Sequence, residues 1–540
     1  MKKYLPCLIF AVITLAIMFP LYQSGFVFLL DMIFTPHSNF NNYINSGTSS
    51  DLPIKILIEL FSFILPLEII QKIILSLVLF LPGLLMYKLT KLFLPEKWAI
   101  LSGIFYMLNP FVYERFLAGH WYVLLGYAFF PLLVKLFLEF LEKSNNKNFL
   151  KFAFLFSVFP ILSLHWAYIS TGFLLILATV YLFLSPAKEI KKLAKYSILL
   201  ILSFLIINSF WLLNFFSPSG NYYKFSLNDF AAFTTKADPN FGVLFNVLSL
   251  YGFWGSDFFL PKDFSPYWWI LTLIILFFSI YGIYKLFFVN KEAKLPCRGS
   301  LASKSLALTL FIIFIPTVLL SIGYSSEITK PIINFLYEFL PGFKGLRETE
   351  KLVGLIAFSY AILVPIGGFV YAKKQKYIFA LLILIPFLST WTIFWGFNRQ
   401  LQSNDYPKSW YQTNQILKED ENNKLLFLPW HGYPNVPFAN NAIISNPASK
   451  FFQIEVIASK SIDSVYLLEL DQGIWDKKIL ALLHGLETLD ENTEFLQSEN
   501  ITHIMLAKFP NWERYGFLEE SNKLQKTFET NDLVLYKINY

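Results

Sequence analysis

Long runs of apolar residues, separated by short polar segments, fill the first 397 residues of the chain. A helix that crosses a bilayer needs about 20 predominantly apolar residues. The first run, 4–23, follows Lys2 and Lys3 and has no clear small-x-small cleavage site, so we expect an uncleaved span. With it, the pattern predicts about eleven spans, at residues 4–23, 73–92, 98–116, 121–141, 150–164, 167–184, 197–216, 267–288, 306–323, 352–372 and 377–397.

The segment 54–70 is also apolar, but only Gln71 and Lys72 separate it from the next run. This spacing leaves no room for an independent span. We therefore expect a helix that lies in the outer membrane interface.

Beyond residue 397 the apolar segments become short. Residues 410–418 have the spacing of an amphipathic helix, and 476–486 indicate a second helix. Short segments rich in β-branched and aromatic residues predict strands at 424–428, 501–506 and 533–538. The pattern predicts an all-α polytopic membrane domain at residues 1–397, followed by a small α/β domain at residues 398–540.

Composition and charge agree with this division. The chain is 55% apolar and only 15% charged, whereas soluble domains carry about a quarter charged residues. An ordinary cytosolic enzyme, a disordered chain and a fibrous repeat are therefore excluded. Residues 1–397 hold 31 basic and 18 acidic residues, a balance of +13, and residues 398–540 hold 13 and 19, a balance of −6.

The distribution of basic residues predicts the orientation in the membrane. If the N-terminus is cytoplasmic, the inner loops and span ends collect 20 basic residues and 4 acids, and the outer loops collect 10 basic residues and 13 acids. Cytoplasmic loops carry an excess of Lys and Arg, so we expect the N-terminus inside and the C-terminal domain outside. The outer loops 24–53, 217–266 and 325–351 are long, which places any chemistry on the outer face.

The sequence contains no familiar cofactor motif. Cys7 and Cys297 imply no disulfide framework. No CxxC or HExxH spacing and no phosphate-binding loop is present. We expect no cofactor, and a divalent metal ion stays open as an alternative.

Asp31 is the first candidate for chemistry. It is a lone carboxylate in an apolar segment, 25–36, just past the first span. Desolvating a carboxylate in apolar surroundings is costly, so such a residue usually has a partner or a functional role. Asp31 could act as a general base. The alternative is that it caps a helix or is a solvated acid at the membrane interface.

A second group of candidates lies between two predicted spans on the outer side. Pro110 is expected to break the helix there, which places Glu114, Arg115 and His120 at one short turn. Arg115 is suited to holding a phosphate with two hydrogen bonds, with His120 beside it. The alternative is a structural Glu114–Arg115 network with a Trp/Tyr belt.

Residues 345–351 mix two cations and two acids directly before a predicted span. Arg347 and Lys351, with Glu348 between them, are candidates for a clamp on an anionic head group. An anchor at the membrane interface is the alternative.

Aromatic residues beside carboxylates are typical of sugar-binding sites, because sugars offer an apolar ring face and hydroxyl rims. Trp254 and Asp257 in the loop 217–266, with Trp121 at the start of a span, are candidates for this role. An aromatic belt at the membrane surface would give the same composition. His431 in the tail is interpreted as part of a structural loop.

Four segments carry a resemblance to a known family: 25–36, 109–132, 345–352 and 426–434. They resemble multipass membrane proteins of the type-C glycosyltransferase superfold (GT-C). The mycobacterial arabinofuranosyltransferases that build cell-wall polysaccharide are similar, as are membrane proteins labelled "6-pyruvoyl-tetrahydropterin synthase-related". The resemblance covers most of the membrane part, and its strongest motifs fall in these segments.

The resemblance implies an inverting glycosyltransferase that uses a polyprenyl-phosphate sugar. Asp31 would take the proton of the acceptor hydroxyl. The implied phosphate ligands are Arg115, Arg347 and Lys351, supported by Glu114, His120 and Glu348. The acceptor would be a cell-envelope glycan, lipid or protein; membrane lipid is an expected partner and nucleic acid is not.

Two other interpretations stay open. In these 540 residues we expect no segment that matches the long carbohydrate-binding extension of the arabinofuranosyltransferases, so the sugar and the acceptor are undetermined. A non-catalytic protein on the same scaffold, such as a transporter, flippase or envelope assembly factor, is the alternative function. The spans hold few interior charges, which disfavours an ion-coupled path.

Overall fold

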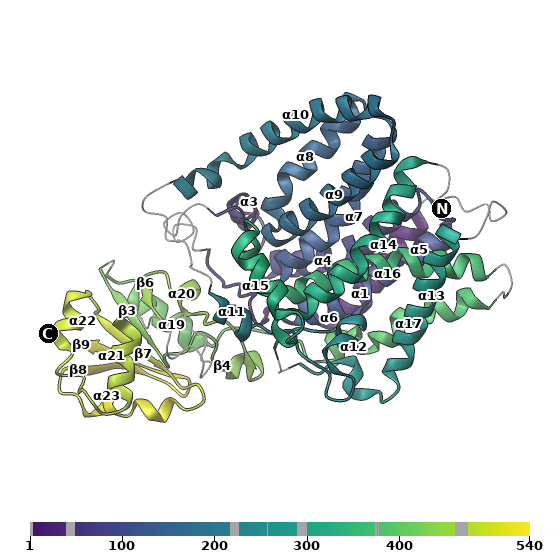
Figure 1. Cartoon of the computed structure of the whole chain (residues 1–540). Helices are drawn as coiled ribbons and strands as arrows, with labels where there is room; N and C mark the ends of the chain where they lie inside the picture. Colours follow the sequence, from purple (N-terminus) through teal and green to yellow (C-terminus); the bar gives the residue numbers. More distant parts are fainter. Residues whose placement is uncertain are drawn as a thin grey trace. The chain divides into compact units, whose positions relative to one another are not determined.

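The computed structural model describes residues 4–38, 49–216, 226–255, 258–288, 300–372, 375, 377–420, 422–459 and 474–540. The fold is mostly helical, with a small sheet near the C-terminus (Figure 1). The chain forms two compact units. The first comprises Met1–Phe19, Tyr43–Leu57 and Ile74–Asn398, and the second comprises Pro20–Asn42, Ile58–Ile73 and Arg399–Tyr540.

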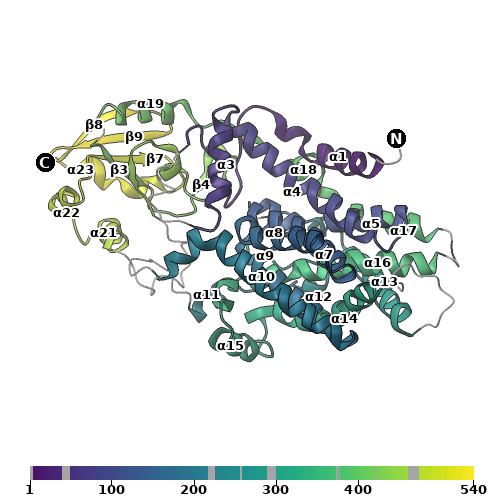
Figure 2. The same cartoon turned by 90° about the horizontal axis from the view of Figure 1, so that it is seen from above.

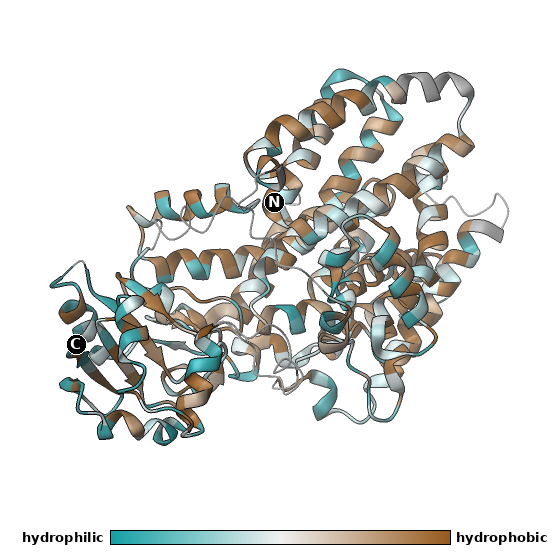
Figure 3. Cartoon of the chain, turned by 60° about the vertical axis from the view of Figure 1, so that its left-hand side comes forward, coloured by the Kyte–Doolittle hydropathy of each residue, from teal (hydrophilic) through white to brown (hydrophobic). Residues whose placement is uncertain are grey.

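Eight helices among the described residues are long and apolar enough to cross a membrane. A helix satisfies its own backbone hydrogen bonds, which is why continuous apolar runs become helices in a bilayer. In Figure 3 these helices carry long hydrophobic stretches. They are α1 (Leu5–Met18, continued by the 3₁₀ turn η2, Phe19–Tyr22), α4 (Leu67–Thr90), α7 (Trp121–Glu142), α9 (Leu164–Leu184), α10 (Ala187–Leu212), α13 (Trp268–Phe288), α14 (Leu301–Ile322) and α16 (Val353–Tyr371). The chain is a multi-pass membrane protein.

The predicted count of about eleven spans is not confirmed. The run at 98–116 forms two short helices, α5 (Glu96–Met107) and α6 (Pro110–Leu117), because Pro110 cannot continue a helix and Asn109 caps the next one. The run at 150–164 forms α8 (Asn146–Leu162), one residue short of the length needed for a candidate span. The run at 377–397 forms a pair, α17 (Ile378–Ser389) and Trp391–Asn398, bent by 55°, which would make a ninth span if it crosses as one.

The predicted interfacial helix at 54–70 is also divided. Its first part is α3 (Leu52–Ser62), and its last residues begin α4. Pro66 precedes α4 directly, where the missing N–H of proline costs no hydrogen bond.

Helix α16 occupies the centre of the first unit and packs against α5, α13, α14 and α17. Almost all of its apolar length is buried, whereas almost none of α10 is. Glycines allow α13 and α16 to approach closely: a Cβ on Gly282 would lie 2.6 Å from the carbonyl oxygen of Leu363. Short helices lie in the predicted outer loops: α11 (Leu227–Ala232), α12 (Gly242–Leu248), α15 (Lys330–Phe339) and the 3₁₀ turns η7 (Phe343–Leu346) and η8 (Thr349–Leu352).

The second unit contains a five-stranded sheet in the order β6-β3-β7-β9-β8. The strands are β3 (Lys424–Leu428), β6 (Glu455–Ile457), β7 (His503–Ala507), β8 (Leu524–Glu529) and β9 (Leu533–Ile538). Strand β3 runs parallel to β6 and β7, and β9 runs antiparallel to β7 and β8. The predicted α/β tail is therefore present, and β3 and β9 have the predicted bounds; β6 and β8 were not predicted.

Both faces of the sheet are covered. Leu426 and Leu428 of β3 pack with α21 (Ile474–Leu483), and Phe427 packs against Trp410 of α19 (Lys408–Leu417). Figure 2 shows α19 and α21 on opposite sides of the strands. The remaining elements are the pairs β1 (Phe26–Val27) with β2 (Ser403–Asn404) and β4 (Asn435–Val436) with β5 (Ala442–Ile443), and the helices α20 (Ala448–Phe451), α22 (Thr493–Ser498) and α23 (Phe517–Glu520).

Candidate functional site

A buried network of charged residues in the first unit is centred on Arg115 of α6. One guanidinium nitrogen, Nη1, lies 3.1 Å from Glu348 Oε2, and the other, Nη2, lies 2.9 Å from Glu350 Oε1. Nη1 also lies 2.9 Å from His120 Nδ1. The Arg115 side chain is only 1% exposed. Helix α6 and the segment before α16 are thereby joined across more than 230 positions of sequence.

Lys351 extends this network. Its Nζ lies 3.0 Å from Glu348 Oε1 and 3.1 Å from His165 Nε2, near the start of α9. We call Arg115, His120, His165, Glu348, Glu350 and Lys351 the Arg115 cluster.

The loop after α12 closes over the cluster. The carboxylate of Glu114 accepts hydrogen bonds from the backbone N–H groups of Gly252 at 3.4 Å and Phe253 at 3.1 Å. The Phe253 ring lies 5.0 Å from the Arg115 guanidinium carbon and 5.5 Å edge-on from the His120 ring. Glu114 thus holds this loop against α6 while Phe253 covers the guanidinium.

Arg347 and Trp254 adjoin the same loop. The guanidinium of Arg347 lies 4.3 Å from the Phe233 ring centre, and Phe233 meets Trp254 edge-on at 4.9 Å. Arg347 is half-buried, unlike Arg115 and Lys351. Trp121 is the first residue of α7 and stacks on Tyr122 at 3.6 Å. Asp257 lies outside the described residues.

The Arg115 cluster is close to electrically neutral. Arg115 and Lys351 face Glu348 and Glu350, and all four side chains are at most 9% exposed. A buried ion pair of this kind is strongly disturbed when one partner is removed. An incoming phosphate would have to displace a glutamate before either cation could bind it.

Glu350 was not singled out from the sequence, although it belongs to the 345–351 motif. Its Oε2 atom is buried and has no hydrogen-bond partner among the described residues. The sequence signal was a second acid two residues after Glu348, but only the fold shows that Arg115 is its partner.

Asp31 belongs to the second unit. Its Oδ1 accepts a 2.8 Å hydrogen bond from the hydroxyl of Tyr433, which lies 402 positions later in the chain. Asp31 is partly exposed, whereas Leu29, Met32 and Ile33 beside it are buried. A carboxylate at the surface of an otherwise buried segment has access to a ligand and a fixed position.

The segment around Asp31 is fixed by hydrogen bonds on both sides. The Gln71 side chain accepts from Val27 N at 2.9 Å and donates to Val27 O at 2.7 Å. Ser445 N donates to Leu30 O at 2.7 Å, and the Tyr406 hydroxyl donates to Phe34 O at 3.0 Å.

Strand β1 reinforces this arrangement by pairing with β2. Gly25, which precedes β1, has φ +94°, and a Cβ there would lie 2.7 Å from backbone atoms of Asn404. Only glycine adopts this conformation at such close approach without strain.

The tail motif 426–434 supplies the partner of Asp31. Tyr433 N donates to His431 Nδ1 at 2.9 Å, and the His431 carbonyl accepts from Asn446 Nδ2 at 3.1 Å. His431 therefore shapes the loop that presents Tyr433, in agreement with the structural role expected for it. Sequence reasoning missed Tyr433, although it lies inside one of the four segments that carried the resemblance.

Within the described part of the chain, no group of three or more His, Cys, Asp or Glu side chains is arranged to hold a metal ion.

Comparisons with known proteins support the fold. No protein-family model matches the sequence, and no curated protein matches it. A solved structure of arabinofuranosyltransferase AftD from Mycobacteria matches with a TM-score of 0.66 at 13% identity, over 100% of this chain and 40% of that chain. Two structures of a mutant of that protein match with TM-scores of 0.63 and 0.62, at 11% and 13% identity, over 42% of that chain.

The expected GT-C fold is therefore confirmed. At this identity the likeness establishes the fold, and this chain spans about two fifths of the length of the AftD chain.

Proposed function

We propose that this chain is a membrane glycosyltransferase. In this proposal it transfers a sugar from a polyprenyl-phosphate donor to a cell-envelope acceptor on the outer face of the membrane. The observation that carries the proposal is the Asp31 carboxylate, partly exposed in a rigid, buried segment and hydrogen-bonded by Tyr433. The AftD-like fold and the membrane spans agree with it.

The reaction we propose is a single displacement. The Asp31 carboxylate takes the proton of the acceptor hydroxyl while the acceptor oxygen forms a bond to the anomeric carbon of the sugar. The bond from that carbon to the phosphate oxygen breaks, and its electron pair leaves with the polyprenyl phosphate. One displacement inverts the anomeric centre, and Asp31 then releases its proton to water.

Tyr433 has a positioning role in this proposal. Its hydroxyl donates to the Oδ1 atom of the Asp31 carboxylate at 2.8 Å. Hydrogen bonds to a charged carboxylate are stronger than neutral ones, so Tyr433 restricts the rotation of the Asp31 side chain. A base that is already oriented avoids part of the entropy loss of reaching the transition state.

The predicted phosphate ligands separate into two kinds. Arg115 and Lys351 are already paired with Glu348 and Glu350, so we give them the role of bracing the loop that carries Phe253. Arg347 is half-buried over the Phe233 ring, and its role as a phosphate ligand stays a prediction from the sequence. A fixed cation stabilises the charge that develops on the leaving phosphate.

The test is transfer of labelled sugar from polyprenyl-phosphate donors by the purified chain. Asp31→Asn keeps the shape of the side chain but cannot accept the proton, so we expect turnover to fall about 10²–10⁴-fold. Donor binding should persist, because asparagine adds no clash.

Asp51→Asn is the matched control and should change little, since Asp51 already pairs with Lys55 on the next turn of the chain. Full activity of Asp31→Asn would show that another residue is the base. Donor binding without transfer to any acceptor would favour a non-catalytic protein, and transfer from a nucleotide sugar without lipid would contradict the proposed donor.

A further inference from the structure

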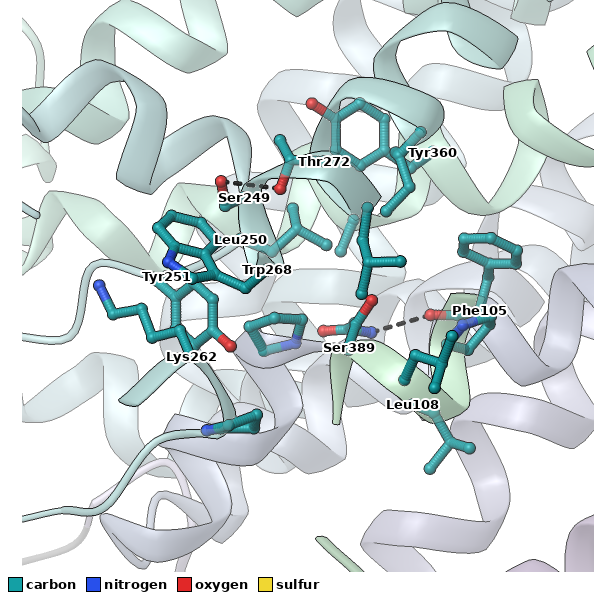
Figure 4. Close-up of a pocket in the computed structure, with 18 of the residues that line it drawn as sticks. Phe105, Leu108, Ser249, Leu250, Tyr251, Lys262, Trp268, Thr272, Tyr360 and Ser389 are labelled. Carbon is teal, nitrogen blue, oxygen red and sulfur yellow. Dashed lines mark hydrogen bonds between the residues drawn. The ribbon is translucent and has the colours of Figure 1, made fainter. Parts of the chain in front are cut away.

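A pocket lies in the first unit, among residues that the proposed reaction does not use; its space, counted together with open solvent at its edge, is about 630 Å³. Its walls come from the end of α5, the end of α12, the first turns of α13 and α16, and the end of α17 (Figure 4). The basic-residue pattern predicts that the end of α12 and the first turns of α13 and α16 lie towards the outer side of the membrane. The pocket therefore begins at the outer loops and reaches inward among the spans.

Three of the polar side chains in the pocket wall, Thr272, Tyr360 and Ser389, are already hydrogen-bonded within the protein. Thr272 donates to Ser249 at 3.0 Å, as Figure 4 shows. The Tyr360 hydroxyl donates to the Leu248 carbonyl at 3.0 Å, and Ser389 donates to the Ile385 carbonyl. A sugar or another ligand rich in hydroxyls would leave most of its own polar groups unsatisfied here. A hydrocarbon chain has no polar groups that need hydrogen-bond partners.

Two apolar helices, α13 and α17, contribute exposed side chains to the pocket wall. Leu271 and Ile275 of α13 are half-exposed, and Leu388 at the end of α17 is 52% exposed. In a bilayer, the surroundings of this side are lipid chains. Exposed apolar side chains on a membrane protein mark surfaces that contact lipid, so this wall is the side from which a lipid chain would enter.

The outer rim of the pocket is polar. Lys262 Nζ lies 2.9 Å from Asp238 Oδ2 and 2.7 Å from Asn246 Oδ1, with its ammonium group 5.4 Å from the Trp268 ring centre. Burial by itself would raise the pKa of Asp238, but the hydrogen bonds from Lys262 and from backbone N–H groups outweigh it and hold that pKa below its usual range. Asp238 therefore stays ionised at neutral pH, and its ion pair with Lys262 forms a dipolar rim above an apolar interior.

We propose that this pocket holds one hydrocarbon chain of a membrane phospholipid, which enters between α13 and α17 and leaves its headgroup at the Lys262–Asp238 rim. The apolar interior, the hydrogen-bonded side chains of its wall and the exposed apolar side chains of α13 and α17 match a chain, and the dipolar rim matches a headgroup. This proposal stands whether or not the chain is a glycosyltransferase.

Lipid retention tests the proposal. The full chain is purified from nanodiscs of phosphatidylethanolamine and phosphatidylglycerol, and the lipid that survives detergent washing is counted by native mass spectrometry. We expect one retained phospholipid per chain. Leu271→Trp fills the pocket mouth, and loss of contact for even two methylenes should lower lipid affinity about tenfold.

Leu273→Trp is the matched control. Leu273 lies on the same helix, is exposed and does not line the pocket, so this variant should retain the lipid. Equal retention by Leu271→Trp and the wild type would overturn the proposal.

A second measurement uses the wild-type chain alone. Phosphatidylglycerol with a photoactivatable group near the end of its acyl chain should label the peptide that contains Leu271–Ile275. Labelling confined to other exposed helices, such as α10, would overturn the proposal. So would displacement of the retained phospholipid by polyprenyl phosphate at equal concentration, since the pocket would then belong to the donor.

Discussion

Replacing Arg115 by methionine unbalances the charges of the Arg115 cluster. In the native protein Arg115 and Lys351 oppose Glu348 and Glu350, so the four charges sum to zero. Without Arg115 the sum is −1. Glu348 keeps Lys351, but Glu350 loses its one hydrogen-bond donor among the described residues while it stays 1% exposed.

The expected loss of stability depends on whether Glu350 then stays charged or takes up a proton. If it stays charged, removal of one partner of a buried ion pair costs about 3–5 kcal/mol. If it takes up a proton, the cost from an ordinary pKa of about 4.3 is about 3.7 kcal/mol at pH 7 and about 1 kcal/mol at pH 5. We therefore expect Arg115→Met to lose about 3–4 kcal/mol at pH 7 and clearly less at pH 5.

Thermal unfolding of the full chain in detergent, at both pH values, measures this loss. Adding Glu350→Gln to Arg115→Met restores neutrality and should recover more than half of the stability. Lys330→Met is the control, since it breaks an exposed ion pair with Glu327, which is worth at most about 1 kcal/mol. If Arg115→Met unfolds like the wild type but loses donor binding, Arg115 is a phosphate ligand and the bracing role is refuted.

Three further predictions concern other parts of the molecule. Burial, helped by Lys537, lowers the pKa of His503 in β7 to about 4. The contribution of neutral His503 to stability is therefore complete above the unfolded pKa of about 6.5 and is lost as the pH falls towards 4. His503→Gln should reduce this dependence of stability on pH, measured by hydrogen exchange of β7. Gly282→Ala should destabilise the chain by about 1–3 kcal/mol, because its Cβ would meet the α16 backbone, whereas Gly172→Ala, with nothing within 4 Å, should stabilise it by up to about 1 kcal/mol in the same thermal assay. Protease added to intact spheroplasts should remove the tail beyond residue 398; cleavage only after permeabilisation would reverse the orientation.

The boundaries of several elements follow directly from local sequence. A bilayer leaves an apolar run no hydrogen-bond partner except its own backbone, so runs such as 121–141 and 352–372 become helices α7 and α16 within two residues of the predicted bounds. Strands β3 and β9 are recognisable for a similar local reason, since each is a short apolar run between polar turns. Where a span is broken, as at Pro110, the sequence shows the break but not whether the two halves cross the membrane together.

The candidate site was predictable as a set of residues and not as a set of contacts. The sequence singled out Asp31, Arg115 and Lys351 because charges in apolar surroundings are costly without a partner or a task. It could not name those partners, because Tyr433 lies 402 positions from Asp31 and Glu350 lies 235 positions from Arg115. Local patterns report how a segment meets water, lipid or its own backbone, whereas a pairing between distant side chains exists only once the helices and the sheet have packed. Tertiary packing therefore decided that Arg115 is neutralised, and that Asp31 is held by the tail domain.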